Sequence, residues 1–134
     1  MYNNEYAHLK VLLVEDNKIN QLFIGKQLSN WNVSYEIADN GEKAIEKILS
    51  EEYHLILMDL YMPIIDGFEA TRMLRQVYHQ ISVPIIALTA SESVEDYQKA
   101  FNAGITDYLL KPIKGMDLYH CLSNYLFKLV PNVS

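Results

Sequence analysis

The chain has 134 residues, of which half are hydrophobic and about a fifth are charged, and its formal net charge is -6 at pH 7. This length and composition exclude a disordered chain and predict a single domain over residues 1–134, with a core over about residues 8–130. The acidic balance argues against a surface for nucleic-acid phosphates and favours a protein or a cation as the partner.

Export and membrane insertion are not predicted by any segment. The first residues have neither a basic region nor an apolar stretch behind them, and the longest apolar runs have the length of a strand. The single cysteine, Cys121, falls in an apolar helical stretch and fits a reducing cytoplasm. The four histidines are far apart, without metal-ligand spacing, and predict no shared site: His8, His54, His79 and His120.

The chain begins with a predicted strand and helix. Residues 9–14 are a Leu- and Val-rich run that ends at Glu15 and Asp16. From Lys18 to about residue 30 the apolar residues change to near-helical spacing, and Asp16 or Asn17 can cap the start. The residues with this spacing are Ile19, Leu22, Phe23, Gln27, Leu28 and Trp31.

A short alternating strand over residues 34–38, expected near the sheet edge, precedes a turn at residues 39–41. A second helix over about residues 42–49 follows, with one apolar face formed by Ala44, Ile45, Ile48 and Leu49. The next apolar run, residues 55–58, stops abruptly at Asp59. It predicts a strand buried on both faces, with this carboxylate at its carboxyl end.

The second half continues the alternation of helix and strand. A helix from Gly67 to about His79 is expected to bury Phe68, Ala70, Leu74 and Val77. A buried strand over residues 83–89 has Pro84 near its start, where proline is tolerated.

The helix that follows is capped by Ser91 or Ser93 and ends near Gly104. Its apolar face is the thinnest of the chain and consists of Val94, Tyr97 and Phe101. A fifth strand over residues 107–110 leads into Lys111 and Pro112. The last helix, from about Lys114 to a stop at Pro131, presents Leu118, Cys121, Leu122, Tyr125, Leu126 and Leu129.

Five strand–helix units in succession predict an α/β fold, with a doubly wound, five-stranded parallel sheet. The flavodoxin-like order 2-1-3-4-5 is expected, with its switch point between the first and third strands. Glu15, Asp16 and Asp59 end those two strands, so the fold predicts that three carboxylates meet in one crevice. Thr89 and Lys111 end the fourth and fifth strands at the same rim.

This set of side chains predicts phosphoryl chemistry. Alone, Asp59 would be a turn cap, Thr89 a helix cap and Lys111 a solvated charge. Three acids together repel unless a cation neutralises them, and their hard oxygen ligands suit Mg²⁺. A carboxylate beside a metal, a lysine and a hydroxyl is equipped to become an acyl phosphate, with Asp59 as the nucleophile.

Over nearly its whole length the chain resembles a receiver domain of a two-component response regulator. The matching residues are Glu15–Asp16, Met58–Asp59, Met62–Pro63, Asp66–Gly67, Thr89–Ala90, Tyr108 and Lys111–Pro112. The resemblance implies that Asp59 accepts a phosphoryl group from a phosphohistidine on a histidine kinase or a histidine phosphotransfer domain. It also implies that the peptide bond between Lys111 and Pro112 is cis.

Further roles are implied by the same resemblance. Asp16, Asp59 and the Tyr61 backbone carbonyl would bind Mg²⁺, or alternatively Mn²⁺, with Glu15 acting directly or through water. Thr89 and Lys111 would each contact a phosphoryl oxygen. Tyr108 would turn inward as Thr89 moves, changing the surface of the fourth helix, fifth strand and fifth helix. Such a domain supports its own phosphorylation and dephosphorylation but does not turn over external substrates.

Three sequence segments favour one branch of this family. Residues 15–20, 67–72 and 84–90 look most like receivers of hybrid sensor histidine kinases. The chain is then either a free-standing receiver or a piece of a larger, membrane-anchored protein. The output domain or protein, and a homodimer, are left open.

Tyr61 and Ser91 are the variable positions that would flank the phosphoryl group. Tyr61 either hinders attacking water or simply packs in its loop. Two rival functions remain. A haloacid-dehalogenase-type phosphatase needs an acid two residues after the nucleophile, where this chain has Tyr61. A receiver-like protein that only binds partners would not need the complete set of Asp59, Thr89 and Lys111.

Overall fold

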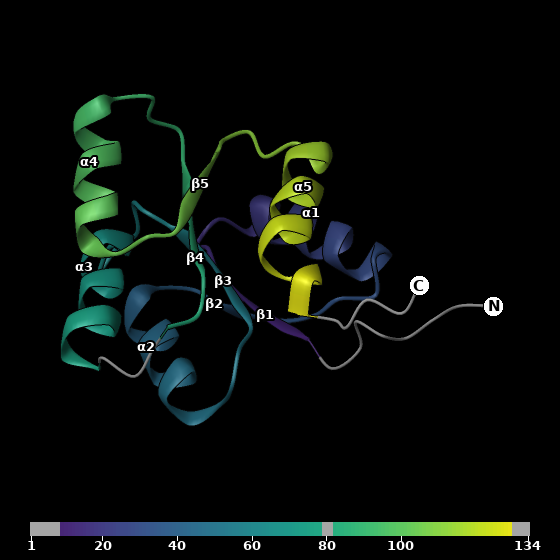
Figure 1. The fold of residues 1–134 in the computed structure, drawn as a ribbon, viewed down its shortest axis with the longest axis horizontal. Helices are drawn as coiled ribbons and strands as arrows, with labels where there is room; N and C mark the ends of the chain where they lie inside the picture. Colours follow the sequence, from purple (N-terminus) through teal and green to yellow (C-terminus); the bar gives the residue numbers. More distant parts are fainter. Residues whose placement is uncertain (1–8, 79–81, 130–134) are drawn as a thin grey trace.

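The computed structural model describes residues 9–78 and 82–129 as alternating strands and helices (Figure 1). The strands are β1 (Lys10–Val14), β2 (Ser34–Ala38), β3 (Leu55–Asp59), β4 (Ile85–Thr89) and β5 (Asp107–Leu110). The helices are α1 (Lys18–Asn30), α2 (Gly41–Ser50), α3 (Gly67–Arg72), α4 (Val94–Ala103) and α5 (Gly115–Tyr125). A π-helical turn, Met73–Val77, extends α3, and a 3-10 turn, Phe127–Leu129, follows α5.

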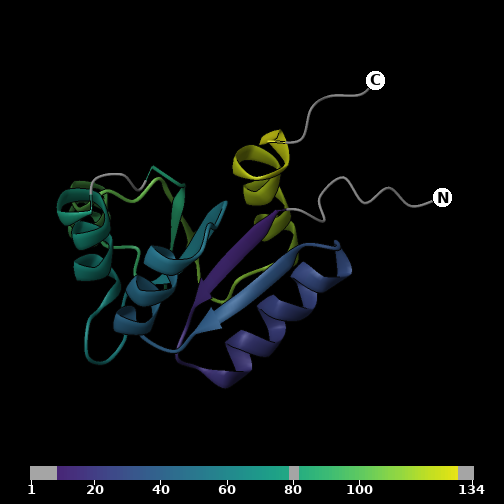
Figure 2. The ribbon, with the colours of Figure 1, turned by 90° about the horizontal axis from the view of Figure 1, so that it is seen from below.

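All the strands are parallel and form one sheet in the order β2-β1-β3-β4-β5. This confirms the predicted flavodoxin-like α/β fold and the edge position of β2. Helices α2, α3 and α4 cover one face of the sheet, and α1 and α5 cover the other (Figures 1 and 2). β3 and β4 are buried along their whole length, as their apolar runs predict.

Successive side chains of each strand enter the cores on opposite faces of the sheet. In β3, Ile56 and Met58 pack under α2 and α3, while Leu55 and Leu57 pack under α1 and α5. The two cores hold the central strands rigidly, so the carboxyl ends of these strands are well placed to carry a precise arrangement of polar groups.

The apolar residues predicted for α1 are only partly buried. Ile19 and Leu22 are about three-quarters exposed and Phe23 is 43% exposed. The helix buries Leu28, as expected, and with it Gln21, Ile24 and Gly25. Apolar residues occur on both sides of this helix, so their spacing identifies a helix without fixing which side faces the sheet.

Other residues of the expected apolar helix faces are also exposed, among them Leu49 of α2 at 52% and Phe101 of α4 at 46%. Val77 is 52% exposed, because the π-helical turn adds a residue to the last turn and shifts the side chains that follow around the axis. His79, the expected end of the third helix, and Pro131, the expected stop of the last helix, both lie outside the described residues. In α4 Val94 is 74% exposed, and only Ala100 and Ala103 are buried.

Predicted helix ends are confirmed at several positions. The side chains of Asn17 and Ser93 cap α1 and α4. Gly104 ends α4 in the left-handed region, at φ 117°. The peptide bond between Lys111 and Pro112 is cis.

Candidate functional site

Strand register brings the predicted site residues to one edge of the sheet. Val14 of β1 lies opposite Met58 of β3, so Glu15 and Asp59 follow at the same level. Along the next pairs, Asp59 lies opposite Leu88 and Thr89 lies opposite Leu110. Thr89 and Lys111 therefore end β4 and β5 one step further along the same rim.

Three carboxylates meet at this rim, as predicted. One carboxylate oxygen from each of Glu15, Asp16 and Asp59 lies within 4.8 Å of the others. Glu15 is fully buried and Asp59 is 4% exposed, whereas Asp16 faces solvent. The Glu15 Oε2 atom accepts a hydrogen bond from the Asn17 backbone N–H at 3.0 Å, which fixes the direction of this buried acid.

Lys111 is the cation of the cluster. Its Nζ atom lies 3.1 Å from Glu15 Oε1 and 3.1 Å from Asp59 Oδ2. Burial and the charge of Glu15 raise the pKa of Asp59 to about 6, even though Lys111 acts in the opposite direction. Burial lowers the pKa of Lys111, but its two carboxylate neighbours outweigh this and raise it above the usual value. The positive charge of Lys111 thus offsets only part of the repulsion between Glu15 and Asp59.

The donor set fits a hard divalent cation. All three side chains offer oxygen ligands, one from a solvent-facing residue that leaves room for water. Mg²⁺ prefers one or two carboxylates together with waters and phosphate oxygens. Burial and the neighbouring Glu15 raise the pKa of Asp59, and the charge of a bound cation would offset both effects.

Close backbone approach shapes the loop after β3. The Gly67 N–H donates to the Leu60 carbonyl at 2.9 Å. A Cβ atom at Gly67 would overlap the Asp59 carbonyl oxygen and the Leu60 Cα atom. Glycine is therefore needed for α3 to start so close to the end of β3.

Thr89 and Tyr108 occupy the adjacent strands. The Thr89 side chain is buried, and its Oγ1 atom accepts a hydrogen bond from the Ser91 N–H at 3.0 Å. The Tyr108 ring stacks on Tyr97 of α4, with centroids 4.4 Å apart, and meets the Phe101 ring edge at 6.4 Å. Tyr108 thus packs against α4.

Tyr61 lies in the loop after β3 and is 55% exposed. Its backbone N–H donates to Asp59 Oδ1 at 3.3 Å, and its hydroxyl donates to Asp96 Oδ2 at 2.8 Å. Its ring meets the Phe68 ring edge-on, with centroids 5.6 Å apart. The structure thus places Tyr61 beside the acidic cluster, as predicted, and in contact with α4.

Gln21 and Asp96 are contacts that sequence reasoning missed. The Gln21 side-chain amide donates to the Glu15 carbonyl at 2.6 Å and to Asp39 Oδ1 at 3.1 Å, which ties the ends of β1 and β2 to α1. A glutamine among polar and apolar neighbours carries no distinctive pattern. Asp96 follows Ser93 by three residues, a spacing that indicates a helix start and nothing more.

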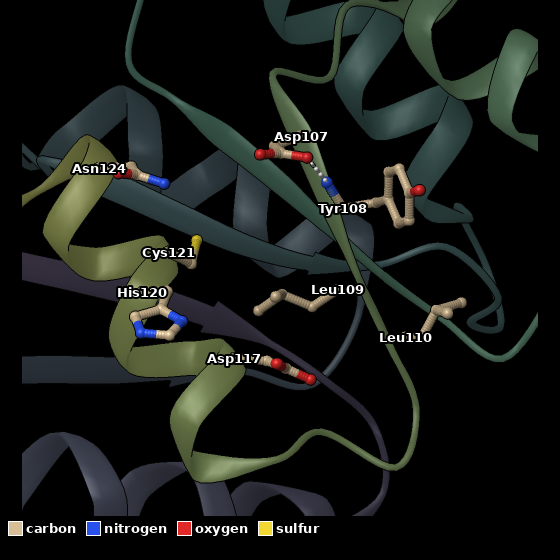
Figure 3. Close-up of a pocket in the computed structure, with 8 residues that line it drawn as sticks. All are labelled: Asp107, Tyr108, Leu109, Leu110, Asp117, His120, Cys121 and Asn124. Carbon is tan, nitrogen blue, oxygen red and sulfur yellow. Dashed lines mark hydrogen bonds between the residues drawn. The ribbon is translucent and has the colours of Figure 1, made fainter.

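A cavity of about 360 Å³ lies between β5 and α5 (Figure 3). Tyr108 and Leu109 leave β5 on opposite sides, so Leu109 points toward α5 (Figure 3). Cys121 also lines this cavity, and burial raises the pKa of its thiol to about 12, which disfavours the thiolate form. The acids of the rim do not line this cavity.

Among the helices of the described residues, none is long and apolar enough to cross a membrane.

The sequence model of the response regulator receiver domain family matches residues 11–123 of this chain. The chain is 37% identical over 117 residues to the signal transduction histidine-protein kinase BarA of Escherichia coli K12, a match that covers 87% of this chain and 13% of BarA. It is 39% identical over 120 residues to hybrid signal transduction histidine kinase B of Dictyostelium discoideum, covering 81% of this chain and 6% of that protein. The chain therefore spans only a small part of these relatives.

Solved structures give the same result. The Ssk1 receiver domain of Saccharomyces cerevisiae, crystallised with the phosphotransfer protein Ypd1, matches with a TM-score of 0.87 and 34% identity over 94% of each chain. The receiver domain of the Pseudomonas aeruginosa sensor histidine kinase PA1611 matches with a TM-score of 0.81 and 37% identity, covering 87% of this chain and 96% of that one. That structure has a magnesium ion coordinated in its active-site cleft.

Proposed function

The chain belongs to the response regulator receiver family of two-component signalling, and on this premise we propose that Asp59 accepts a phosphoryl group from a phosphohistidine. The observation that carries the proposal is the buried Asp59 carboxylate, with Lys111 Nζ at 3.1 Å and two further acids beside it. Burial of a partly neutralised carboxylate costs stability, and a structural role alone does not account for it.

In the proposed transfer, an Asp59 carboxylate oxygen attacks phosphorus while the bond from phosphorus to the imidazole nitrogen breaks. An acyl phosphate forms on Asp59, and the histidine leaves as a neutral imidazole after taking up a proton. Lys111 already lies within 3.1 Å of Asp59, where its ammonium can pair with a phosphoryl oxygen. The work of the protein is chiefly to position and stabilise charge.

Glu15, Asp16, Asp59 and the Tyr61 backbone carbonyl would hold Mg²⁺, with Mn²⁺ as the alternative. A bound cation supplies charge neutralisation for the phosphoryl oxygens. The magnesium in the PA1611 receiver supports this assignment. The fully buried Glu15 orients the site from one side, and the exposed Asp16 leaves the other side open to water.

Thr89 and Tyr108 are proposed to convert phosphorylation into a change of surface. The Thr89 hydroxyl would donate to the phosphoryl group and draw the start of the loop after β4 toward Asp59. Its present bond from Ser91 N–H couples that loop to Thr89. Because Tyr108 packs on α4, movement of α4 would change the surface of α4, β5 and α5.

The exposed apolar side chains of α1 are proposed to dock the phosphohistidine donor, a histidine kinase or a histidine phosphotransfer domain. Ile19 and Phe23 line a groove of about 220 Å³ together with Pro112 and Ile113. Pro112 follows Lys111, so the groove adjoins the phosphoacceptor rim. The crystallised pair of Ypd1 and the Ssk1 receiver supports a phosphotransfer protein as the occupant.

The receiver is proposed to act as one module of a phosphorelay. Its relatives are much longer hybrid kinases, so the upstream kinase, a cytoplasmic location and any membrane anchor belong to this proposal. An output domain or protein and a homodimer are further partners that the changed surface could serve. The chain is proposed to support its own phosphorylation and dephosphorylation only.

The test is incubation with acetyl phosphate and Mg²⁺, followed by intact mass measurement. One added phosphoryl group in the wild type, absent in Asp59→Asn and absent with a chelator, supports the proposal. A conservative control is Glu52→Gln, an exposed loop acid that should label like the wild type. Steady release of phosphate from unrelated monoesters would instead support a phosphatase.

A further inference from the structure

We propose that Asp96 is a positioning residue for the phosphoacceptor site, and that its hydrogen bond with the Tyr61 hydroxyl sets the lifetime of the aspartyl phosphate. This inference rests on the proposed function of Asp59. It assigns a role to an acid of α4 that lies outside the cluster of strand-end carboxylates.

Tyr61 is held at both of its ends. Its backbone N–H contacts Asp59 Oδ1 at 3.3 Å, and its hydroxyl contacts Asp96 Oδ2 at 2.8 Å. Between these ends, the ring packs edge-on against Phe68, which is 4% exposed and fixed in the core. The Tyr61 side chain therefore spans the gap from the phosphoacceptor loop to the first turn of α4.

Asp96 is itself firmly placed. Its backbone N–H donates to the Ser93 Oγ atom at 3.3 Å in the N-terminal cap of α4. The hydrogen bond with Tyr61 also holds the pKa of Asp96 below its usual value, so the carboxylate is ionised and accepts strongly. The bond thus joins the segment that leaves Asp59 to the segment that follows Thr89.

Burial alone does not hold the Tyr61 ring. Because the residue is 55% exposed, a tyrosine without a partner for its hydroxyl would exchange between rotamers that face solvent. One hydrogen bond then decides how often the ring lies beside Asp59. Through this bond, the half-buried Asp96 of α4 would influence chemistry in the neighbouring crevice.

Hydrolysis is the step that the ring would slow. A water oxygen attacks phosphorus, the bond from phosphorus to the Asp59 oxygen breaks, and Asp59 returns as a carboxylate. The water oxygen leaves in inorganic phosphate, and its protons pass to phosphate and solvent. A bulky ring held next to the acyl phosphate restricts the approach of that water.

The test measures decay of the aspartyl phosphate. Each protein is loaded with acetyl phosphate and Mg²⁺, the donor is removed, and the loss of the phosphoryl group is followed by intact mass. Tyr61→Phe and Asp96→Ala are expected to decay about threefold to tenfold faster than the wild type, the range expected for one lost hydrogen bond. The double variant should be no faster than either single variant, because both remove the same bond.

Two further variants separate this bond from helix and charge effects. Asp96→Asn keeps an oxygen that can accept from Tyr61, and it should restore a rate near that of the wild type. Glu95→Ala removes a carboxylate from the same turn of α4 without touching the bond, and its decay should be unchanged.

If the wild type takes up the phosphoryl group, and Tyr61→Phe and Asp96→Ala lose it at the wild-type rate, that result would overturn this inference and leave the proposed function intact. Additive rates in the double variant would overturn it as well. A wild type that takes up no phosphoryl group would contradict the proposed function, and this inference with it.

Discussion

Asp59→Asn should stabilise the fold at neutral pH in the absence of divalent cations. The raised pKa of Asp59, about 6 instead of 3.8, means that ionising this carboxylate costs the folded state stability. At 1.36 kcal/mol for each pH unit, this difference corresponds to about 3 kcal/mol above pH 7. The stability is present below about pH 4, is lost as the pH rises through 6, and does not fall further above it.

Urea unfolding in a chelator, followed through the fluorescence of Trp31, gives the comparison. With a slope of about 1.5 to 2 kcal/mol per molar urea, the midpoint of Asp59→Asn should exceed that of the wild type by about 1.5 to 2 M at pH 7.5. At pH 4.5 the difference should shrink to about 1 kcal/mol. Glu52→Gln serves as the control, because an exposed loop acid should leave the midpoint unchanged at both values. Equal midpoints at pH 7.5, or a difference that does not change with pH, would refute the reasoning.

Three further outcomes concern the steps of phosphorylation. Lys111→Gln should take up the phosphoryl group from acetyl phosphate about 100-fold more slowly than the wild type, because it lacks the ammonium that pairs with a phosphoryl oxygen. An uptake rate equal to that of the wild type, measured by intact mass, would contradict this. Thr89→Ala should still be phosphorylated on Asp59, but beryllofluoride should no longer change hydrogen exchange around Tyr108. If beryllofluoride alters hydrogen exchange in this variant as it does in the wild type, the result counts against the proposed switch. Phe23→Asp should slow transfer from a phosphohistidine protein about tenfold while leaving labelling by acetyl phosphate unchanged; a loss of both would place Phe23 in the fold instead of the docking surface.

Most of the site could be predicted because it depends on strand ends. Apolar runs locate the buried strands, and alternation of strands and helices fixes a parallel sheet. The carboxyl ends of its strands then meet at one edge. Glu15, Asp59, Thr89 and Lys111 follow from that logic alone, and the register between β1, β3, β4 and β5 bears it out.

Features that depend on helix rotation could not be predicted. Ile19, Leu22 and Phe23 have the spacing of a buried face, yet they are exposed because α1 turns Ile24 and Leu28 toward the sheet. Burial of an apolar side chain is favourable on either side, so periodicity alone does not select the orientation. The docking role proposed for this face rests on the structure alone, in which Ile19 and Phe23 line a groove with Pro112.

Contacts between distant side chains were also beyond the sequence. The bond from Tyr61 to Asp96 joins residues 35 positions apart, and nothing in either local pattern indicates it. The same holds for Gln21, whose amide donates to the side chain of Asp39, 18 positions away. Such contacts depend on the distance between loops and helices, which the order of elements does not determine.

The central claim is that Asp59 becomes an acyl phosphate, and reduction of that group tests it most directly. The chain is treated with acetyl phosphate and Mg²⁺, then with borohydride, which reduces an acyl phosphate to an alcohol, and peptides are mapped by mass. The account predicts homoserine at position 59 and unmodified Glu15 and Asp16, with no reduction when a chelator is present. Reduction at Glu15 or Asp16, or none at all in a chain that binds Mg²⁺, would contradict it.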